Sequence, residues 1–186
     1  MTGAISKEAS QARIIVVGGG VRSGKSAFAV DLGHRLGARR AFVATATESD
    51  EEMRARIARH RCDRQGAFDT IEEPVALVEA LARLRDYDVV VVDCLTLWLS
   101  NRLIRGEVVD EILQEVDRLV AVLQERRFHA VLVTNEVGMS VHPPTPLGRA
   151  FVELSGFAHQ RVARAADEIY LAILGKVLKI APTPWT

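Results

Sequence analysis

The sequence predicts an α/β fold in which helices flank a mostly parallel β-sheet. The first observation is a glycine-rich stretch at 18–26, which follows an apolar run at 13–17 and precedes a helix-compatible run at 27–32. The chain thus reads strand, loop and helix in that order. The second observation is the recurrence of apolar runs, which predict further strands at 40–46, 87–94 and 130–136. Apolar continuity of this kind is typical of parallel strands that are buried on both faces of a sheet.

The glycine-rich stretch, called the P-loop below, fits the pattern G-x-x-x-x-G-K-S that binds nucleotide phosphates. Its glycines let backbone N–H groups close around phosphate oxygens, and the next helix adds the positive end of its dipole. Lys25 is expected to reach the β and γ phosphates and the Ser26 hydroxyl to bind Mg²⁺. A glycine-rich turn with a surface lysine is the alternative, but that would not require the flanking strand and helix. The predicted nucleotide contacts are Gly19, Gly20, Val21, Arg22, Ser23, Gly24, Lys25 and Ser26.

Length and charge narrow the possible classes of protein. A chain of 186 residues with 48% hydrophobic residues fits one domain, expected at 13–186, after a frayed tail at 1–12. The formal net charge at pH 7 is zero, so there is no overall basic field to bind nucleic acid. Any binding partner must therefore be recognised by a local group of residues and not by the overall charge of the protein.

The sequence shows no pattern typical of a membrane span, a signal peptide or a disulfide framework. No stretch approaches the ~18 consecutive apolar residues of a membrane span, and residues 1–12 lack the apolar core of a signal peptide. Two cysteines, Cys62 and Cys94, are too few for a disulfide framework or a metal cluster, so we expect free thiols. A cytoplasmic protein is the expectation.

The segment after the P-loop is defined by helix-end signals. A helix over 26–36 is expected to stop near Gly37, a residue suited to the left-handed C′ position. After the next strand, Ser49 and Glu52 form a capping box that predicts a helix to about residue 62.

This second helix carries His60 among several arginines. Positive neighbours disfavour the protonated imidazole, so a neutral, nucleophilic nitrogen is expected at pH 7. The arginines could also hold phosphates, which would let His60 attack an α-phosphorus while cations stabilise the developing charge. A solvated, charged helix with an incidental histidine is the other interpretation.

Two later strands end in carboxylates at the edge where open parallel sheets bind ligands. The run at 87–94 ends near Asp93, which is either the acid on the Mg²⁺ side of a P-loop protein or a turn former. The run at 130–136 ends with Glu136, which could hold metal, orient an acceptor hydroxyl or act as a structural cap. The Gly- and Pro-rich stretch at 138–146 is expected to be a loop that faces the substrate.

The remaining elements are predicted by periodicity and turn chemistry. Residues 68–74 are expected to be extended, with Pro74 in the first turn of the helix that follows. Trp98 is expected in the core or an interface, and Pro146 at the first position of the last helix. Gly175 separates two strands that form a tight antiparallel pair, over 168–174 and 176–180. Helical spacing predicts helices over 75–84, 95–103, 108–127 and 147–166.

Four stretches, in this order along the chain, point to one family. They are the P-loop with Arg22-Ser23, the helix from Glu52-Met53 to His60-Arg61, the strand end from Val133 to Met139, and Gln160 through Ala166-Asp167-Glu168. Together they resemble the bifunctional adenosylcobinamide kinases and adenosylcobinamide-phosphate guanylyltransferases of cobalamin biosynthesis. The resemblance covers nearly the whole chain after residue 13. Gln65 and Phe68 depart from the pattern, because members often have Pro and Trp there.

The resemblance implies a RecA-like P-loop NTPase, a homotrimer, and two reactions on one corrinoid. A nucleoside triphosphate, ATP or GTP, would phosphorylate the aminopropanol hydroxyl of adenosylcobinamide. GTP would then guanylylate His60, which matches the family's nucleophile, and GMP would move to the phosphorylated corrinoid. Beyond the P-loop, the family's GTP contacts carry over to Ala44, Thr45, Ala46, Arg61, Cys62, Asp63, Arg64, Glu72 and Asp93.

Two other functions stay open from the residues alone. In a simple small-molecule kinase, His60 would be a surface residue, and no nucleotide would stay bound covalently after GTP is added. A nucleotide-dependent switch would show slow hydrolysis and nucleotide-gated association with a partner, without a corrinoid acceptor.

Overall fold

The computed structural model describes residues 11–47 and 66–180. The helix predicted from Ser49, including His60, and most of the predicted N-terminal tail lie outside the described residues. The strands are β1 (Ile14–Gly19), β2 (Arg40–Ala44), β3 (Asp69–Glu72), β4 (Val89–Asp93), β5 (His129–Val133), β6 (Glu168–Ile173) and β7 (Lys176–Ile180). The helices are α1 (Lys25–Leu36), α3 (Leu77–Arg83), α4 (Leu95–Ile104), α5 (Val109–Gln124) and α6 (Pro146–Ala165).

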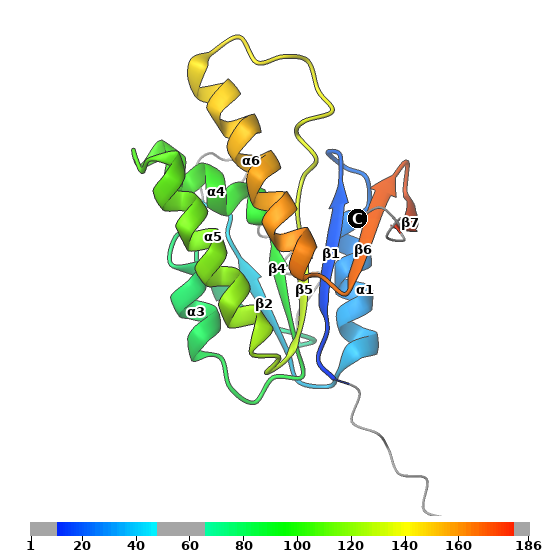
Figure 1. Ribbon diagram of the computed structural model, residues 1–186. Helices are drawn as coiled ribbons and strands as arrows, with labels where there is room; N and C mark the ends of the chain where they lie inside the picture. Colours follow the sequence, from blue (N-terminus) through cyan, green and yellow to red (C-terminus); the bar gives the residue numbers. More distant parts are fainter. Residues whose placement is uncertain (1–10, 48–65, 181–186) are drawn as a thin grey trace, which may run out of the picture.

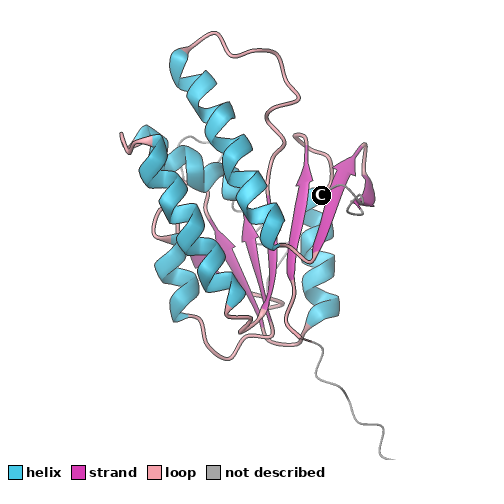
Figure 2. Cartoon of the chain, in the orientation of Figure 1, coloured by secondary structure: helices cyan, strands magenta, loops and turns pink. Residues whose placement is uncertain are grey.

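All seven described strands join one sheet, with helices on both faces (Figures 1 and 2). The strand order is β3-β2-β4-β5-β1-β6-β7. Each neighbouring pair is parallel except β6 and β7, which are antiparallel. The predicted fold class, a mostly parallel sheet with an antiparallel pair at its C-terminal end, is confirmed.

Alternation along β1 shows how the strands separate two hydrophobic layers. Ile14 and Val16 belong to the larger core, whose helical residues come from α3, α4, α5 and α6. Ile15 and Val17 point the other way, into a smaller core that includes Ala29 of α1. Because both faces are covered, the central strands are apolar throughout, as the sequence predicted.

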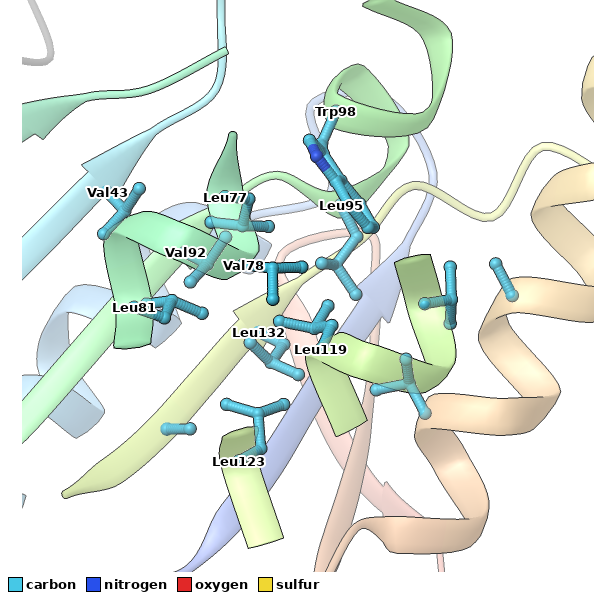
Figure 3. Close-up of a cluster of buried hydrophobic side chains, with 14 of the residues drawn as sticks. Val43, Leu77, Val78, Leu81, Val92, Leu95, Trp98, Leu119, Leu123 and Leu132 are labelled. Atoms are coloured by element: carbon cyan, nitrogen blue, oxygen red, sulfur yellow. The ribbon is translucent and has the colours of Figure 1, made fainter. Parts of the chain in front are cut away.

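The larger core holds the only described tryptophan (Figure 3). Trp98 is 1% exposed and packs near Leu95, while its indole Nε1 donates a 2.8 Å hydrogen bond to the Val75 carbonyl. The expected core position of Trp98 is confirmed. The hydrogen bond also satisfies the one polar atom of the side chain, so its burial carries no unpaired group.

Two turn predictions are confirmed at the C-terminal end. Leu174 and Gly175, at φ 51° and 75°, form the two-residue turn between β6 and β7. Positive φ at both positions matches the right-handed twist of a hairpin. Thr145 caps α6 by accepting a hydrogen bond from the Gly148 N–H, and Pro146 is at its first turn.

Two helix-end predictions are wrong. Gly37 has φ −175°, which is extended rather than left-handed; a Cβ there would lie 2.2 Å from the Asp88 Cβ, so close packing explains the glycine. Pro74 precedes the helix instead of occupying its first turn, because α3 begins only at Leu77. The Glu73 carboxylate accepts hydrogen bonds from two N–H groups in the turn between Pro74 and α3, and these bonds stabilise that turn.

No helix among residues 11–47 and 66–180 combines the length and the apolar character that crossing a membrane would require.

Candidate functional site

The parallel sheet brings the predicted site residues to a single edge. Across five neighbouring strands the register aligns Glu72, Ala44, Asp93, Val133 and Val17 in one row. All five strands end at or just after this row, so the segments that follow them share the carboxyl edge of the sheet. The P-loop follows β1 there, next to the polar strand end of β5.

The P-loop has a conformation that requires its glycines. Gly19 has φ 153°, and a Cβ at that position would lie 2.5 Å from the Ala172 carbonyl oxygen and 2.7 Å from Ser23 Oγ. Gly24, at φ 96°, is the N-cap of α1. Arg22 also has positive φ, at 56°. Both glycines are therefore needed for backbone geometry.

Neighbouring segments support the loop from outside. The Gly175 N–H in the β6–β7 turn donates a 3.2 Å hydrogen bond to the Ser23 carbonyl. A Cβ on Gly24 would also lie 3.6 Å from the Gly175 Cα. The C-terminal hairpin, which the sequence predicted only as a strand pair, thus packs against the P-loop.

Lys25 is held over the loop. It is 7% exposed, and its ammonium donates a 2.9 Å hydrogen bond to the Gly20 carbonyl. Because α1 begins at Lys25, the N–H groups of its first turn and its positive dipole end point towards the loop. A positive side chain above such a helix end is suited to binding phosphate.

The side chains of the loop differ in exposure. Val21 and Arg22 are exposed, whereas Ser23 is 7% exposed and Ser26 is half-buried. The buried Ser23 hydroxyl has no hydrogen-bond partner within the described part of the chain. A buried hydroxyl without a partner costs free energy, so an oxygen-bearing ligand at the loop would remove a penalty.

The residues present fit a magnesium ion that is shared with a nucleotide. Ser26 is in the first turn of α1, and Asp93 ends β4 at the same edge. Both offer oxygen ligands, which Mg²⁺ prefers. Among the described residues no three His, Cys, Asp or Glu side chains converge as a metal-binding group. Mg²⁺ is usually held by one or two carboxylates plus substrate phosphates and waters.

Thr45 ties the ends of β2 and β4 together. Its hydroxyl donates to the Cys94 carbonyl and accepts from the Cys94 N–H, both at 2.7 Å, and the residue is 0% exposed. Asn101 of α4 donates a 2.8 Å hydrogen bond to the Thr45 carbonyl. The Thr45 side chain is therefore fully engaged inside the protein. The Asp93–Cys94 peptide bond that it clamps is cis.

Cys94 is a free, buried thiol in the described part of the chain. Burial, and secondarily the charge of Asp93, raises its pKa to about 11. The thiol is therefore protonated at neutral pH and is a poor nucleophile.

Glu136 contacts the P-loop through its backbone. Its N–H donates a 3.0 Å hydrogen bond to the Gly19 carbonyl. The side-chain Oε1 accepts a 2.8 Å hydrogen bond from the Gly138 N–H, so it caps the turn that leaves β5. Of the three roles that the sequence allowed for Glu136, this is the structural cap. The turn uses one carboxylate oxygen and not the other.

Sequence reasoning missed a buried chain of hydrogen bonds beside this strand end. His159 of α6 contacts the Thr134 hydroxyl, Thr134 contacts Thr96 of α4, and Thr96 accepts from the Asn135 N–H. Burial lowers the pKa of His159, against the opposing charge of Glu136. No local pattern could have found these partners, because Thr96, Thr134 and His159 are 25 or more positions apart in the sequence.

Glu72 is exposed at the end of β3, on the outermost strand of the same edge. Phe68, where the sequence departs from the family pattern, is 8% exposed, and its ring packs against Phe42 with centroids 6.3 Å apart. His60, Arg61, Cys62, Asp63 and Arg64 lie outside the described residues, so their predicted roles stay predictions.

Comparison with known proteins gives a family for this chain. Residues 15–180 match the model of the family described as cobinamide kinase / cobinamide phosphate guanyltransferase. The bifunctional adenosylcobalamin biosynthesis protein CobP of Pseudomonas aeruginosa is 35% identical over 167 residues, which cover 89% of this chain and 96% of that protein. The bifunctional adenosylcobalamin biosynthesis protein CobU of Escherichia coli is also 35% identical, over 90% of this chain and 99% of that protein.

Solved structures with a similar fold are distant in sequence. The RadB recombinase has a TM-score of 0.52 at 17% identity and covers 87% of this chain and 74% of its own. The flagellar accessory protein FlaH of Methanocaldococcus jannaschii has a TM-score of 0.51 at 13% identity, covering 90% of this chain and 75% of its own. These similarities show a P-loop NTPase fold of the RecA type, as expected.

Proposed function

Because the chain belongs to the cobinamide kinase / cobinamide phosphate guanyltransferase family, we propose that it catalyses both reactions through one P-loop and a histidine–GMP intermediate. The first reaction would transfer the γ-phosphoryl group of ATP or GTP to the hydroxyl of adenosylcobinamide. The second would transfer GMP from GTP to that product, giving adenosylcobinamide-GDP. We place these reactions in the cytoplasm and in a homotrimer.

The observation that carries this proposal is the buried Lys25 above the glycine loop, at a sheet edge that also holds Asp93 and Glu136. Lys25 and the N–H groups around it would bind the nucleotide's phosphates. Mg²⁺ would supply charge neutralisation between the phosphates, with Ser26 and Asp93 as its protein ligands. The unused oxygen of Glu136 would orient the acceptor hydroxyl.

Guanylyl transfer would need a nucleophile besides the P-loop, and the family resemblance assigns that role to His60. An imidazole nitrogen of His60 would attack the α-phosphorus, and the bond to the bridging oxygen would break, releasing pyrophosphate. A phosphate oxygen of the phosphorylated corrinoid would then attack the same phosphorus and release the imidazole. Two displacements replace one difficult transfer.

The intermediate is tested with GTP labelled in its α-phosphate. The wild-type protein should acquire acid-labile label, His60→Ala should acquire none, and Lys25→Ala should acquire much less. His34→Ala, at an exposed position in α1, is the matched control and should label normally. Full labelling of His60→Ala would eliminate His60 as the nucleophile.

The complete reaction is tested by incubating the protein with Mg²⁺, GTP and adenosylcobinamide, followed by mass analysis of protein and corrinoid. Adenosylcobinamide-GDP is the expected product. Phosphorylated corrinoid alone, with no nucleotide on the protein, would support a simple kinase instead. Ultracentrifugation of the same sample should give the mass of a trimer.

A further inference from the structure

We infer that His159 is a positioning residue for phosphoryl transfer, because it holds the β5 strand end against the P-loop through Thr134 and Thr96. The inference rests on the proposed function and assigns a role to residues outside the phosphate-binding loop. It concerns the acceptor side of the site, where Asn135 and Glu136 lie.

The contacts form a continuous chain across three elements. His159 Nε2 on α6 is 2.5 Å from Thr134 Oγ1, which is 3.0 Å from Thr96 Oγ1 on α4. Thr96 Oγ1 accepts a 2.7 Å hydrogen bond from the Asn135 N–H. Thr96 and Thr134 are 4% and 5% exposed, so water has little access to either hydroxyl. Each hydroxyl therefore depends on the next for its hydrogen bond.

The chain has a preferred direction. If Thr96 donates to Thr134 and Thr134 donates to His159 Nε2, every hydrogen in the chain has an oxygen or nitrogen acceptor. In the reverse direction the Thr96 hydroxyl proton would need an acceptor outside the chain of hydrogen bonds. The preferred direction requires a neutral imidazole with its proton on Nδ1. Burial of His159 favours the same neutral form.

The chain acts directly beside the P-loop. The Thr134 N–H donates to the Val17 carbonyl and the Glu136 N–H to the Gly19 carbonyl, each at 3.0 Å. A Cβ on Gly18 would lie 3.9 Å from the Thr134 methyl group. Any movement of Thr134 is therefore transmitted to the strand end that runs along the loop.

Nucleotide binding and phosphoryl transfer should respond differently to loss of His159. The predicted phosphate contacts are residues 19–26, whereas the hydrogen bonds of His159, Thr134 and Thr96 join these residues to one another and to Asn135. A misplacement of about 1 Å on the acceptor side can nevertheless lower a rate about 100-fold. We expect kcat for corrinoid phosphorylation to fall about 10- to 100-fold, with the nucleotide KM within about 3-fold of wild type.

The test compares His159→Phe, which has no acceptor, with His159→Gln, whose side-chain carbonyl can accept from Thr134. Kinetics are measured on the full chain with Mg²⁺, ATP or GTP, and adenosylcobinamide. His159→Phe should lose kcat, and His159→Gln should recover most of it. Self-labelling by α-labelled GTP should change little in either variant, because it does not use the corrinoid acceptor.

His129→Phe is the matched control. His129 is also a half-buried histidine that accepts a hydrogen bond, at 3.0 Å from the Arg13 N–H, but it lies at the opposite end of β5. The same chemical change at His129 should lower the melting temperature and leave kcat within about 3-fold of the wild-type value.

Wild-type kcat in a folded His159→Phe protein would overturn the inference, and so would equal losses in His159→Phe and His159→Gln. If His159→Phe does not fold, Thr96→Val decides: a reduced kcat supports the inference and a wild-type kcat overturns it. If the wild-type protein does not phosphorylate adenosylcobinamide, both the proposed function and this inference fail. If the wild-type protein is active but its kcat does not depend on His159, only the inference fails.

Discussion

Replacing Thr45 by valine should destabilise the protein, because the change removes a buried hydroxyl group. The two side chains have nearly the same shape, so the change mainly removes the hydroxyl group. The Cys94 N–H and carbonyl, however, both lose the Thr45 hydroxyl as a partner in a place that is 0% exposed. The carbonyl still accepts a hydrogen bond from the Trp98 N–H, so the N–H of Cys94 is the group that loses its partner. Leaving one buried polar group unsatisfied should lower the free energy of unfolding by about 1–3 kcal/mol.

For a protein of this size about 1 kcal/mol shifts the melting temperature by about 2–4 °C, so Thr45→Val should melt about 2–12 °C below wild type. Circular dichroism measures the melting temperature, and urea titration measures the free energy of unfolding. Thr45→Ser keeps the hydroxyl and should lose only about 1 kcal/mol for its missing methyl group. Equal stability of the valine and serine variants would refute the assigned role of the hydroxyl.

Three further changes test the loop, a salt bridge and a helix cap. Gly19→Ala places a Cβ 2.5 Å from the Ala172 carbonyl oxygen at φ 153°, so calorimetry should show loss of nucleotide binding; unchanged affinity would contradict the loop geometry. The pKa of Asp167 is lowered, first by its hydrogen bond to Arg126, so its contribution to stability is present above about pH 4 and is lost as pH falls through the folded-state pKa. Asp167→Asn should therefore lower stability at pH 7, by less than about 1 kcal/mol for this partly exposed pair, and should flatten the fall in melting temperature on acidification; an unchanged acid profile would count against it. Thr145→Ala removes the α6 cap and should cost about 1 kcal/mol by urea titration, whereas an unchanged midpoint would show that the cap is dispensable.

Much of the fold could be predicted because its signals are local. The apolar runs of β1, β4 and β5 and the spacing of apolar residues in α5 are properties of short windows, and each element is present. Gly37 and Pro74 show the limit of local rules. Gly37 is extended, and Asp88, 51 positions later, leaves no room for a Cβ there; no helix-end pattern contains that information.

By itself, the sequence determined the chemistry of the P-loop. The glycines, Lys25 and Ser26 are close together in the chain, so a motif of eight residues contains nearly all of the groups predicted to bind phosphate. It also placed Asp93 and Glu136 at strand ends, because apolar runs end where the polar residues begin.

Only the tertiary structure decided which of those strand ends meet and what holds them. Parallel pairing aligns Glu72, Asp93 and the P-loop strand at one edge, although the strand order differs from the chain order. The clamp at Thr45 and the chain from His159 to Thr96 join residues that are far apart in sequence. Such contacts form only when the helices pack against the sheet, because packing is what brings residues from distant parts of the chain together. No short stretch of sequence contains that information.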